Sequence, residues 1–139
     1  MEIWFDDVLI STDPARLDLD AICDMLSRAY WAEGRTRAMI ARSLENSLVF
    51  GVYMAGRQVG IGRVISDFTI LAYLCDVFIL EEYRGIGLSK KLMHTILSHP
   101  DLQGLRKMML ATMDAHGLYA QFGFEPLAKA EMMMEKRNV

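Results

Sequence analysis

The fold of this chain is decided by the stretch Tyr83-Arg84-Gly85-Ile86-Gly87-Leu88-Ser89-Lys90-Lys91. The apolar run before it, residues 71–80, is typical of a strand. The apolar residues after it recur at the spacing of an amphipathic helix, at Leu88, Leu92, Met93, Ile96 and Leu97. A glycine-bearing turn between a strand and a helix N-terminus leaves several backbone N–H groups free. Such groups bind anions, most often phosphate, so this stretch predicts an anion site.

The charges of the stretch point the same way. Three cations, Arg84, Lys90 and Lys91, crowd the positive end of the helix dipole, where each is disfavoured by roughly 0.3–1 kcal/mol. A bound polyanion would reverse that penalty, whereas the alternative is a tight turn followed by a helix with a solvated basic face. The dinucleotide pattern G-x-G-x-x-G fails, because Lys90 takes the third glycine position, and the P-loop pattern is absent.

The stretch resembles the acetyl-coenzyme A loop of the GCN5-related N-acetyltransferase (GNAT) family, whose pattern is R/Q-x-x-G-x-G/A. Arg84, Gly87 and Ser89 fill the three specified positions, with Ser89 where Gly or Ala is usual. A second family signature, a short helix ending in a tyrosine-containing turn and a Gly-Phe pair, is similar to Ala115-His116-Gly117-Leu118-Tyr119-Ala120-Gln121-Phe122-Gly123-Phe124. The family's strand into the loop is similar to Phe78-Ile79-Leu80-Glu81-Glu82-Tyr83, with Glu81 in place of a frequent proline.

The resemblance covers nearly the whole chain and implies an α/β fold. A central mixed, mostly antiparallel sheet with one splayed parallel strand pair would be flanked by about four helices. Periodicity and turn residues predict helices over residues 19–29, 36–44, 88–98 and 115–122. They predict strands over residues 3–10, 48–55, 58–65, 68–80 and 106–112, and a final hairpin of 124–127 with 132–136.

The resemblance also implies acetyl-CoA as a co-substrate. The two strands on either side of the basic helix would be parallel neighbours that part at one end. The gap would accept the pantetheine arm, whose amides would pair with strand backbone near Ile79. The residues expected to bind acetyl-CoA are Phe78, Ile79, Arg84, Gly85, Ile86, Gly87, Leu88, Ser89 and Lys90.

The implied reaction is attack of a neutral amine on the thioester, with CoA leaving as the thiolate. Tyr119 matches the family's tyrosine, and its phenol is the candidate acid for the thiolate. The alternative for Tyr119 is an aromatic residue packed against the sheet with its hydroxyl satisfied.

Asp76 is the candidate base or amine anchor, because a carboxylate inside the apolar run 74–78 is unusual and costly unless paired. The alternative is a structural salt bridge, with Arg63 as its partner. Glu81 and Glu82 flank a turn and are weaker candidates. His116 could relay a proton, but a helix-capping Asp114 with a hydrogen-bonded His116 is the preferred interpretation.

Acceptor recognition in this family usually involves the loop between the first two helices, here residues 30–35. Tyr30, Trp31 and Arg35 are the expected acceptor residues, together with Asp76. Two adjacent aromatic residues with an acid beside a glycine suit an amine or an aromatic ring. The alternative is ordinary packing of Tyr30 and Trp31 at a helix end.

Composition bounds the remaining possibilities. With 139 residues, we expect a single domain over residues 1–139. The net charge of −3 argues against nucleic acid as the main partner. We expect no membrane span and no signal peptide, because no long apolar run or charged leader is present. Two isolated cysteines predict neither a disulfide framework nor a metal site, and they favour a cytoplasmic location.

Together these features predict an N-acetyltransferase that acts on a primary amine of a small molecule or peptide. Two alternatives stay open from the sequence: a non-catalytic acyl-CoA-binding sensor, and a nucleotide-binding module. We also expect a homodimer, because the predicted C-terminal hairpin would expose Met132, Met133 and Met134 beside an edge strand.

Overall fold

Six strands form one mixed sheet, in which the strands lie side by side in chain order. The structure is a computed structural model that describes residues 1–139. The strands are β1 (Glu2–Phe5), β2 (Val8–Ser11), β3 (Leu48–Met54), β4 (Arg57–Ser66), β5 (Leu71–Ile79) and β6 (Lys107–Leu110). The helices are α1 (Leu19–Ser27), α2 (Arg37–Glu45), α3 (Leu88–Ser98) and α4 (His116–Ala120).

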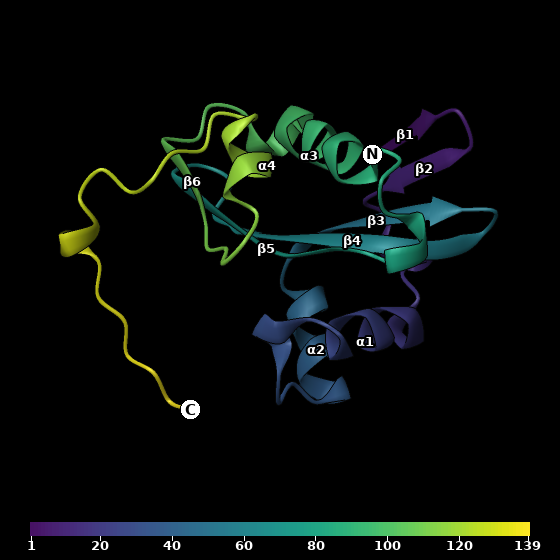
Figure 1. The fold of residues 1–139 in the computed structure, drawn as a ribbon, viewed down its shortest axis with the longest axis horizontal. Coiled ribbons are helices and arrows are strands. Elements are labelled where there is room, and N and C mark those ends of the chain that lie inside the picture. Colours follow the sequence, from purple (N-terminus) through teal and green to yellow (C-terminus); the bar gives the residue numbers. More distant parts are fainter.

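The helices cover both faces of the sheet. Figure 1 shows α1 and α2 on one face and α3 and α4 on the other. The predicted start of α2 is confirmed, because the Thr36 side chain accepts a hydrogen bond from the Met39 N–H. The apolar stripe predicted for α3 is buried against the sheet, with Leu92, Met93 and Ile96 fully covered. None of the helices combines the length and the apolar character needed to cross a bilayer.

The predicted parallel pair is β5 with β6, and it is short. The pairing runs only from Leu71 opposite Lys107 to Leu74 opposite Leu110. Beyond that point β5 continues to Ile79, whereas the chain after Leu110 turns away toward α4. The two strands therefore part at one end, as the family resemblance implied, and they leave a gap on the sheet.

A bulge in β5 places Asp76 at this gap. Ile61 pairs with Phe78 and Arg63 pairs with Cys75, so that Gly62 alone lies opposite two residues of β5. Asp76 has a φ of 54°, in the left-handed region that non-glycine residues rarely adopt. Such strain costs on the order of 1–3 kcal/mol and persists only where the surrounding contacts enforce it.

Two strand predictions were too long, because each contained a turn. The segment 3–10 is a hairpin of β1 and β2, broken at Asp6, whose φ is 55°. The segment 68–80 begins as a strand only at Leu71, because Phe68 has a φ of 58°. The carboxylate of Asp67 accepts hydrogen bonds from the N–H groups of residues 69, 70 and 71, which fixes a turn there.

The predicted C-terminal hairpin of residues 124–127 and 132–136 was wrong. No strand follows β6, and every residue from 125 to 139 is exposed. Pro126 explains part of the difference, because proline has no N–H group to donate to a sheet. Figure 1 shows this tail leaving the body of the protein beside β6. Homodimerisation stays a prediction that rests on the exposed Met132, Met133 and Met134.

Two glycines of β4 give a test of the close packing in the sheet. A Cβ at Gly60 would lie 2.5 Å from Ile79 Cδ1, 3.1 Å from the Phe78 carbonyl oxygen and 3.2 Å from Val52 Cβ. We predict that Gly60→Ala lowers the free energy of unfolding by about 1–3 kcal/mol, because backbone and Cβ atoms cannot yield. Urea unfolding measures the loss.

Gly62→Ala on the same strand is the matched control. There the Cβ would meet only side-chain ends, with Ile96 Cδ1 nearest at 3.1 Å. A loss for Gly62→Ala as large as that for Gly60→Ala would contradict this packing.

Candidate active site

A cavity of about 620 Å³ opens where β5 and β6 part. Its walls come from β5, the loop between α1 and α2, the segment after β6, and α4. Most of the residues predicted from the sequence meet here: Tyr30, Trp31, Arg35, Asp76, Phe78, Ile79, Arg84, Ser89 and Tyr119.

A second hollow, of about 250 Å³, lies at the N-terminus of α3. It is lined by the predicted loop residues Gly85, Gly87, Leu88 and Lys90. Four residues line both spaces, namely Ile79, Arg84, Ser89 and Leu118, so the two spaces adjoin. Ile86 lines neither space, and its side chain is exposed.

The loop presents a row of free backbone donors. The N–H groups of residues 85–90 donate to no acceptor in the protein, and the first helical bond runs from Lys91 N–H to Gly87. Gly87 is the N-cap and lacks a capping side chain. Gly85 and Gly87 have φ values of 83° and 84°, which explains the glycines. The backbone N–H groups of this loop are therefore available to a ligand.

The Arg84 side chain is bonded within the protein and is not free to bind phosphate with all its donors. Its Nε donates to the Ile79 carbonyl at 2.8 Å, and its guanidinium lies 5.1 Å from the centre of the Phe78 ring. The side chain is thus tied to the end of β5. The resemblance implied that the strand backbone near Ile79 pairs with a cofactor, but this carbonyl is already bonded within the protein.

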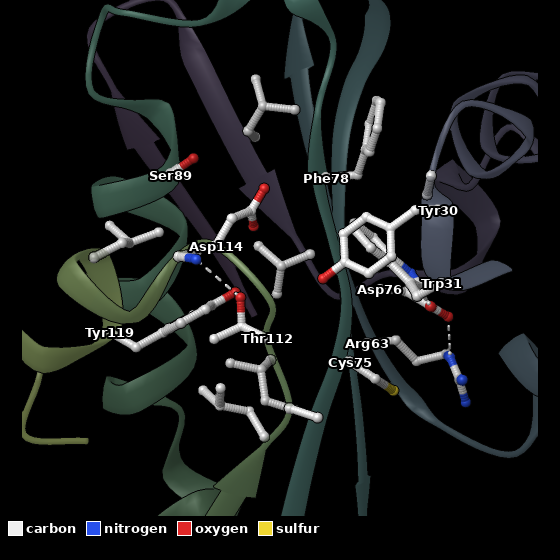
Figure 2. Close-up of a pocket in the computed structure, with 18 of the residues that line it drawn as sticks. Tyr30, Trp31, Arg63, Cys75, Asp76, Phe78, Ser89, Thr112, Asp114 and Tyr119 are labelled. Carbon is white, nitrogen blue, oxygen red and sulfur yellow. Dashed lines mark hydrogen bonds and ion pairs between the residues drawn. The ribbon is translucent and has the colours of Figure 1, made fainter. Parts of the chain in front are cut away.

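Asp76 forms the most connected polar group of the site. Its side chain is 1% exposed and lies between two arginines. Arg63 Nε donates to Oδ2 at 2.8 Å, and Arg35 Nη1 donates to both oxygens at 2.8 and 2.9 Å. Trp31 Nε1 donates to Oδ1 at 2.9 Å. The salt bridge with Arg63 is thus formed, and Asp76 also lines the cavity (Figure 2).

These contacts also set the charge state of Asp76. Burial alone would raise the pKa of the carboxyl, but the hydrogen bonds from Arg63 and Arg35 outweigh it, and the pKa lies below its ordinary value. The carboxylate therefore stays ionised at neutral pH, with its oxygens occupied by donors.

The aromatic loop residues join separate parts of the cavity wall. The rings of Tyr30 and Trp31 pack edge to face with their centres 5.0 Å apart, and the centre of the Trp31 ring lies 6.4 Å from that of Phe78. The Tyr30 hydroxyl accepts a hydrogen bond from the Met113 N–H at 3.0 Å, which links this loop to the segment after β6. Glu33, the acid of the predicted acceptor loop, does not line the cavity.

Tyr119 meets the cavity from the other side. Figure 2 shows Tyr30 and Tyr119 entering from opposite walls, with their hydroxyl groups directed toward the space between them. The Tyr119 residue is 9% exposed, and its hydroxyl makes no hydrogen bond within the protein. Burial raises its pKa, and so do the nearby Tyr30 and Asp114. The phenol is therefore protonated at neutral pH and can donate.

Asp114 does not cap α4, which corrects the preferred interpretation of this residue. The Thr112 hydroxyl instead accepts a hydrogen bond from the Ala115 N–H at 3.0 Å. The Asp114 carboxylate makes no hydrogen bond or ion pair, and it lines the cavity.

Sequence reasoning also missed Arg28, Tyr73 and Leu118, because only the parting of β5 from β6 brings these scattered residues to one space.

The ion-pair network predicts a large effect of Asp76→Asn on stability. The change leaves Arg63 and Arg35 facing a neutral amide, so the free energy of unfolding at pH 7 should fall by about 3–5 kcal/mol. Because the folded-state pKa is lowered, the contribution of the charge is complete above about pH 4 and is lost as the pH falls through the folded-state value. Urea unfolding at pH 7 and pH 3 should therefore show a smaller difference at pH 3.

Asp24→Asn is the matched control, because Asp24 pairs with Arg28 on the exposed side of α1. Its loss should stay within about 0.5 kcal/mol. Equal losses for the two variants would contradict the assigned role of Asp76.

Comparisons with known proteins agree with this geometry. A family model described as an acetyltransferase (GNAT) domain matches residues 24–136. A protein of Gibberella zeae that is provisionally described as an acetyltransferase is 34% identical over 138 residues, covering 83% of this chain and 77% of that protein.

Solved structures extend the comparison. A provisionally assigned GNAT acetyltransferase of Xanthomonas campestris pv. campestris is 47% identical, with a TM-score of 0.92, over 96% of this chain and 95% of that chain. A GNAT acetyltransferase of Elizabethkingia anophelis, solved with acetyl-CoA bound, shares the fold at a TM-score of 0.67 and 14% identity, over 87% of this chain and 78% of that chain. The family model and the two closer relatives show that this chain belongs to the GNAT acetyltransferase family.

Proposed function

We propose that this protein transfers an acetyl group from acetyl-CoA to a primary amine by direct attack in a ternary complex. One observation carries the proposal: the free N–H groups of residues 85–90 adjoin a cavity that the Tyr119 hydroxyl enters. The loop can bind the pyrophosphate of acetyl-CoA, and the phenol at the other end of the two spaces can give a proton to the thiolate leaving group.

The chain's own groups fit the co-substrate. The backbone N–H groups of the loop would bind the pyrophosphate, and Lys90 beside them would add positive charge. Arg84 would brace the end of β5 through Ile79 rather than bind phosphate directly. When bound, acetyl-CoA supplies an acetyl group activated as a thioester.

The proposed reaction needs proton transfer at two atoms, the sulfur and the nitrogen. The amine nitrogen forms the C–N bond with its lone pair, the C–S bond breaks, and its electron pair leaves with the sulfur. The sulfur takes the phenolic proton of Tyr119, and solvent restores that proton. The acceptor gives one proton to solvent before attack, to form the neutral amine, and the nitrogen gives a second to solvent after attack, to form the amide. With one proton returned to Tyr119, the net products from an ammonium acceptor are the amide, free CoA and one proton.

We infer that Asp76 positions the acceptor loop and does not act as the base. Its oxygens already accept four hydrogen bonds, from Trp31, Arg35 and Arg63. A carboxylate stabilised in this way is a weak proton acceptor. Its contribution to turnover would be indirect, through the placement of Trp31 and Arg35 on the cavity wall.

A non-catalytic acyl-CoA sensor would not need a free phenol in the cavity. The Tyr119 hydroxyl has no partner in the protein and points into the cavity, so it is available to donate to a bound group. A free proton donor at this position supports the enzyme over the sensor.

The loop can be tested with Gly87→Val. Because Gly87 has a positive φ and caps α3, a β-branched residue would distort the backbone that presents the donors. We predict that the dissociation constant for acetyl-CoA rises at least about tenfold, which is 1.4 kcal/mol, by isothermal titration.

Gly104→Val separates this effect from general backbone strain. Gly104 also has a positive φ, 74°, and it lines neither space. Its variant should bind acetyl-CoA normally. Unchanged affinity in Gly87→Val would place the phosphate site elsewhere.

The proton donor can be tested with Tyr119→Phe. Only the transition state would lose an interaction, so kcat should fall by roughly 10²–10⁴-fold when chemistry limits turnover, with acetyl-CoA affinity unchanged. The measurement is release of the CoA thiol with an accepted amine.

Tyr53→Phe is the matched control for removal of a buried phenol hydroxyl. The Tyr53 hydroxyl is buried without a partner in β3, away from the cavity. Its variant should keep full activity. Full activity in Tyr119→Phe, with chemistry shown to limit the rate, would return Tyr119 to a packing role.

A further inference from the structure

We infer that the amine acceptor also carries an anionic group, a carboxylate or a phosphate, which binds Arg35 at the end of the cavity away from Tyr119. This inference rests on the proposed acetyltransferase function and goes beyond it, because it names the chemical class of the acceptor. Three features of the cavity carry it: its balance of charge, the unused donors of Arg35, and the position of its only free carboxylate.

The cavity is cationic although the protein as a whole has a net charge of −3. Its charged lining residues are Arg28, Arg35, Arg63, Arg84, Asp76 and Asp114, and no lysine, glutamate or histidine lines it. Arg84 belongs to the end shared with the loop at α3. On the acceptor side, the single charge of Asp76 is matched by both Arg35 and Arg63, which leaves positive charge in excess.

Arg35 has donors to spare. A guanidinium carries five N–H groups, and Arg35 uses only Nη1, which donates to both oxygens of Asp76. Its Nε and Nη2 have no acceptor in the protein, and the side chain remains 29% exposed. The pairing with Asp76 fixes the plane of the guanidinium, so a fork of donors is held ready for a planar carboxylate or a phosphate.

Arg28 can reinforce this end of the cavity. Its Nη2 pairs with Asp24 at 2.8 Å, and both side chains are about half exposed. Such a surface pair is weak, so the cation can turn toward a bound anion at little cost. Two arginines of the lining are therefore available to an anion, and the only lining carboxylate without a partner is Asp114.

The negative end of the cavity lies on the side of Tyr119. Asp114 is the one lining carboxylate without a protein partner, and it is near enough to Tyr119 to raise the pKa of the phenol. An ammonium group would be drawn to this end, beside the proposed proton donor. A zwitterionic acceptor, with its anion on Arg35 and its amine near Asp114, thus matches the charges along the cavity.

Polyamines and other purely cationic amines fit this arrangement poorly. Their second cation would face Arg28 and Arg35, and like charges brought together disfavour the wrong partner.

Matched amines test the inference. The assay follows CoA thiol release with glycine, β-alanine and 4-aminobutyrate, each against its carboxamide, and with phosphoethanolamine against ethanolamine. Putrescine is the dicationic member. We expect kcat/KM to be roughly 10- to 100-fold higher for the anionic member of the preferred pair, as befits a charged hydrogen bond. The carboxylate and phosphate pairs distinguish the two anions.

The ratio of kcat/KM for the two members of a pair is then measured in variants. Arg35→Gln should lower the ratio at least about tenfold, and Arg35→Lys should give an intermediate value because it keeps the charge but loses the fork. Because both substrates are measured on one sample, the ratio does not depend on how much enzyme is folded. Asp114→Asn should lower kcat/KM for both members alike, and Arg42→Gln, on an exposed position of α2 outside the cavity, should leave the ratio unchanged.

The outcomes separate this inference from the function on which it rests. Three results would overturn the inference and leave the acetyltransferase function intact. They are equal kcat/KM for the two members of every pair, a higher kcat/KM for putrescine than for the anionic amines, and a ratio of kcat/KM within a pair that Arg35→Gln does not change. CoA release with none of these amines would overturn both.

Discussion

The buried charge of Asp76 is the interaction on which the site depends. A carboxylate at this depth in a sheet is tolerated only when it is fully paired, and two arginines and an indole N–H supply the partners. Those partners come from β4 and from the loop between α1 and α2. The same contacts that satisfy the charge therefore fasten the loop of residues 30–35 to the strand beside the gap.

The strained backbone at Asp76 fits this interpretation. The bulge puts two residues of β5 opposite Gly62 and gives Asp76 a positive φ. A network that holds both the carboxylate and its partners can enforce such a conformation, and strain of this kind gathers at functional sites. The hydrogen bonds to Asp76 thus hold Trp31 and Arg35 in place in the protein without a ligand.

The parting of β5 and β6 is the second constraint. Because the strands pair over only four residues, the sheet opens beside the loops of residues 30–35 and 85–90, and two adjoining spaces result. One space offers backbone donors, and the other offers a phenol and a cationic wall. Acetyl transfer, as we propose it, follows from the adjacency of these two spaces rather than from any single residue.

The parts predicted best from the sequence were local ones. The glycines at 85 and 87, the cap at Thr36 and the apolar stripe of α3 are set by neighbours within a few residues. The need to pair Asp76 was also visible, since an acid inside an apolar run has few other solutions. The additional partners Trp31 and Arg35 were not visible, because they lie more than 40 positions away and reach Asp76 only through the packing of the loop on the sheet.

The predictions failed where a turn interrupted an apolar segment or where a short segment had no neighbour to pair with. The pair Asp6-Asp7 and the segment at Asp67 were turns inside apparent strands, and their side chains or positive φ values broke the pattern. The predicted C-terminal hairpin failed because two short segments do not form a stable hairpin without a further strand or a core to pack against. The free carboxylate of Asp114 could not be foreseen, since the Thr112 hydroxyl, and not Asp114, accepts the hydrogen bond from the Ala115 N–H, and α4 begins without a side-chain cap.

Binding selectivity tests the central claim most directly. The measurement is the shift in thermal unfolding with acetyl-CoA, CoA, NAD and ATP, each at about a hundredfold excess over the dissociation constant expected for acetyl-CoA. Specific binding at that excess stabilises the folded state by about 2.7 kcal/mol. We predict a clear upward shift with acetyl-CoA and CoA and none with NAD. A shift with NAD or ATP and none with acetyl-CoA would contradict the assignment of the loop and its adjoining cavity to acetyl transfer.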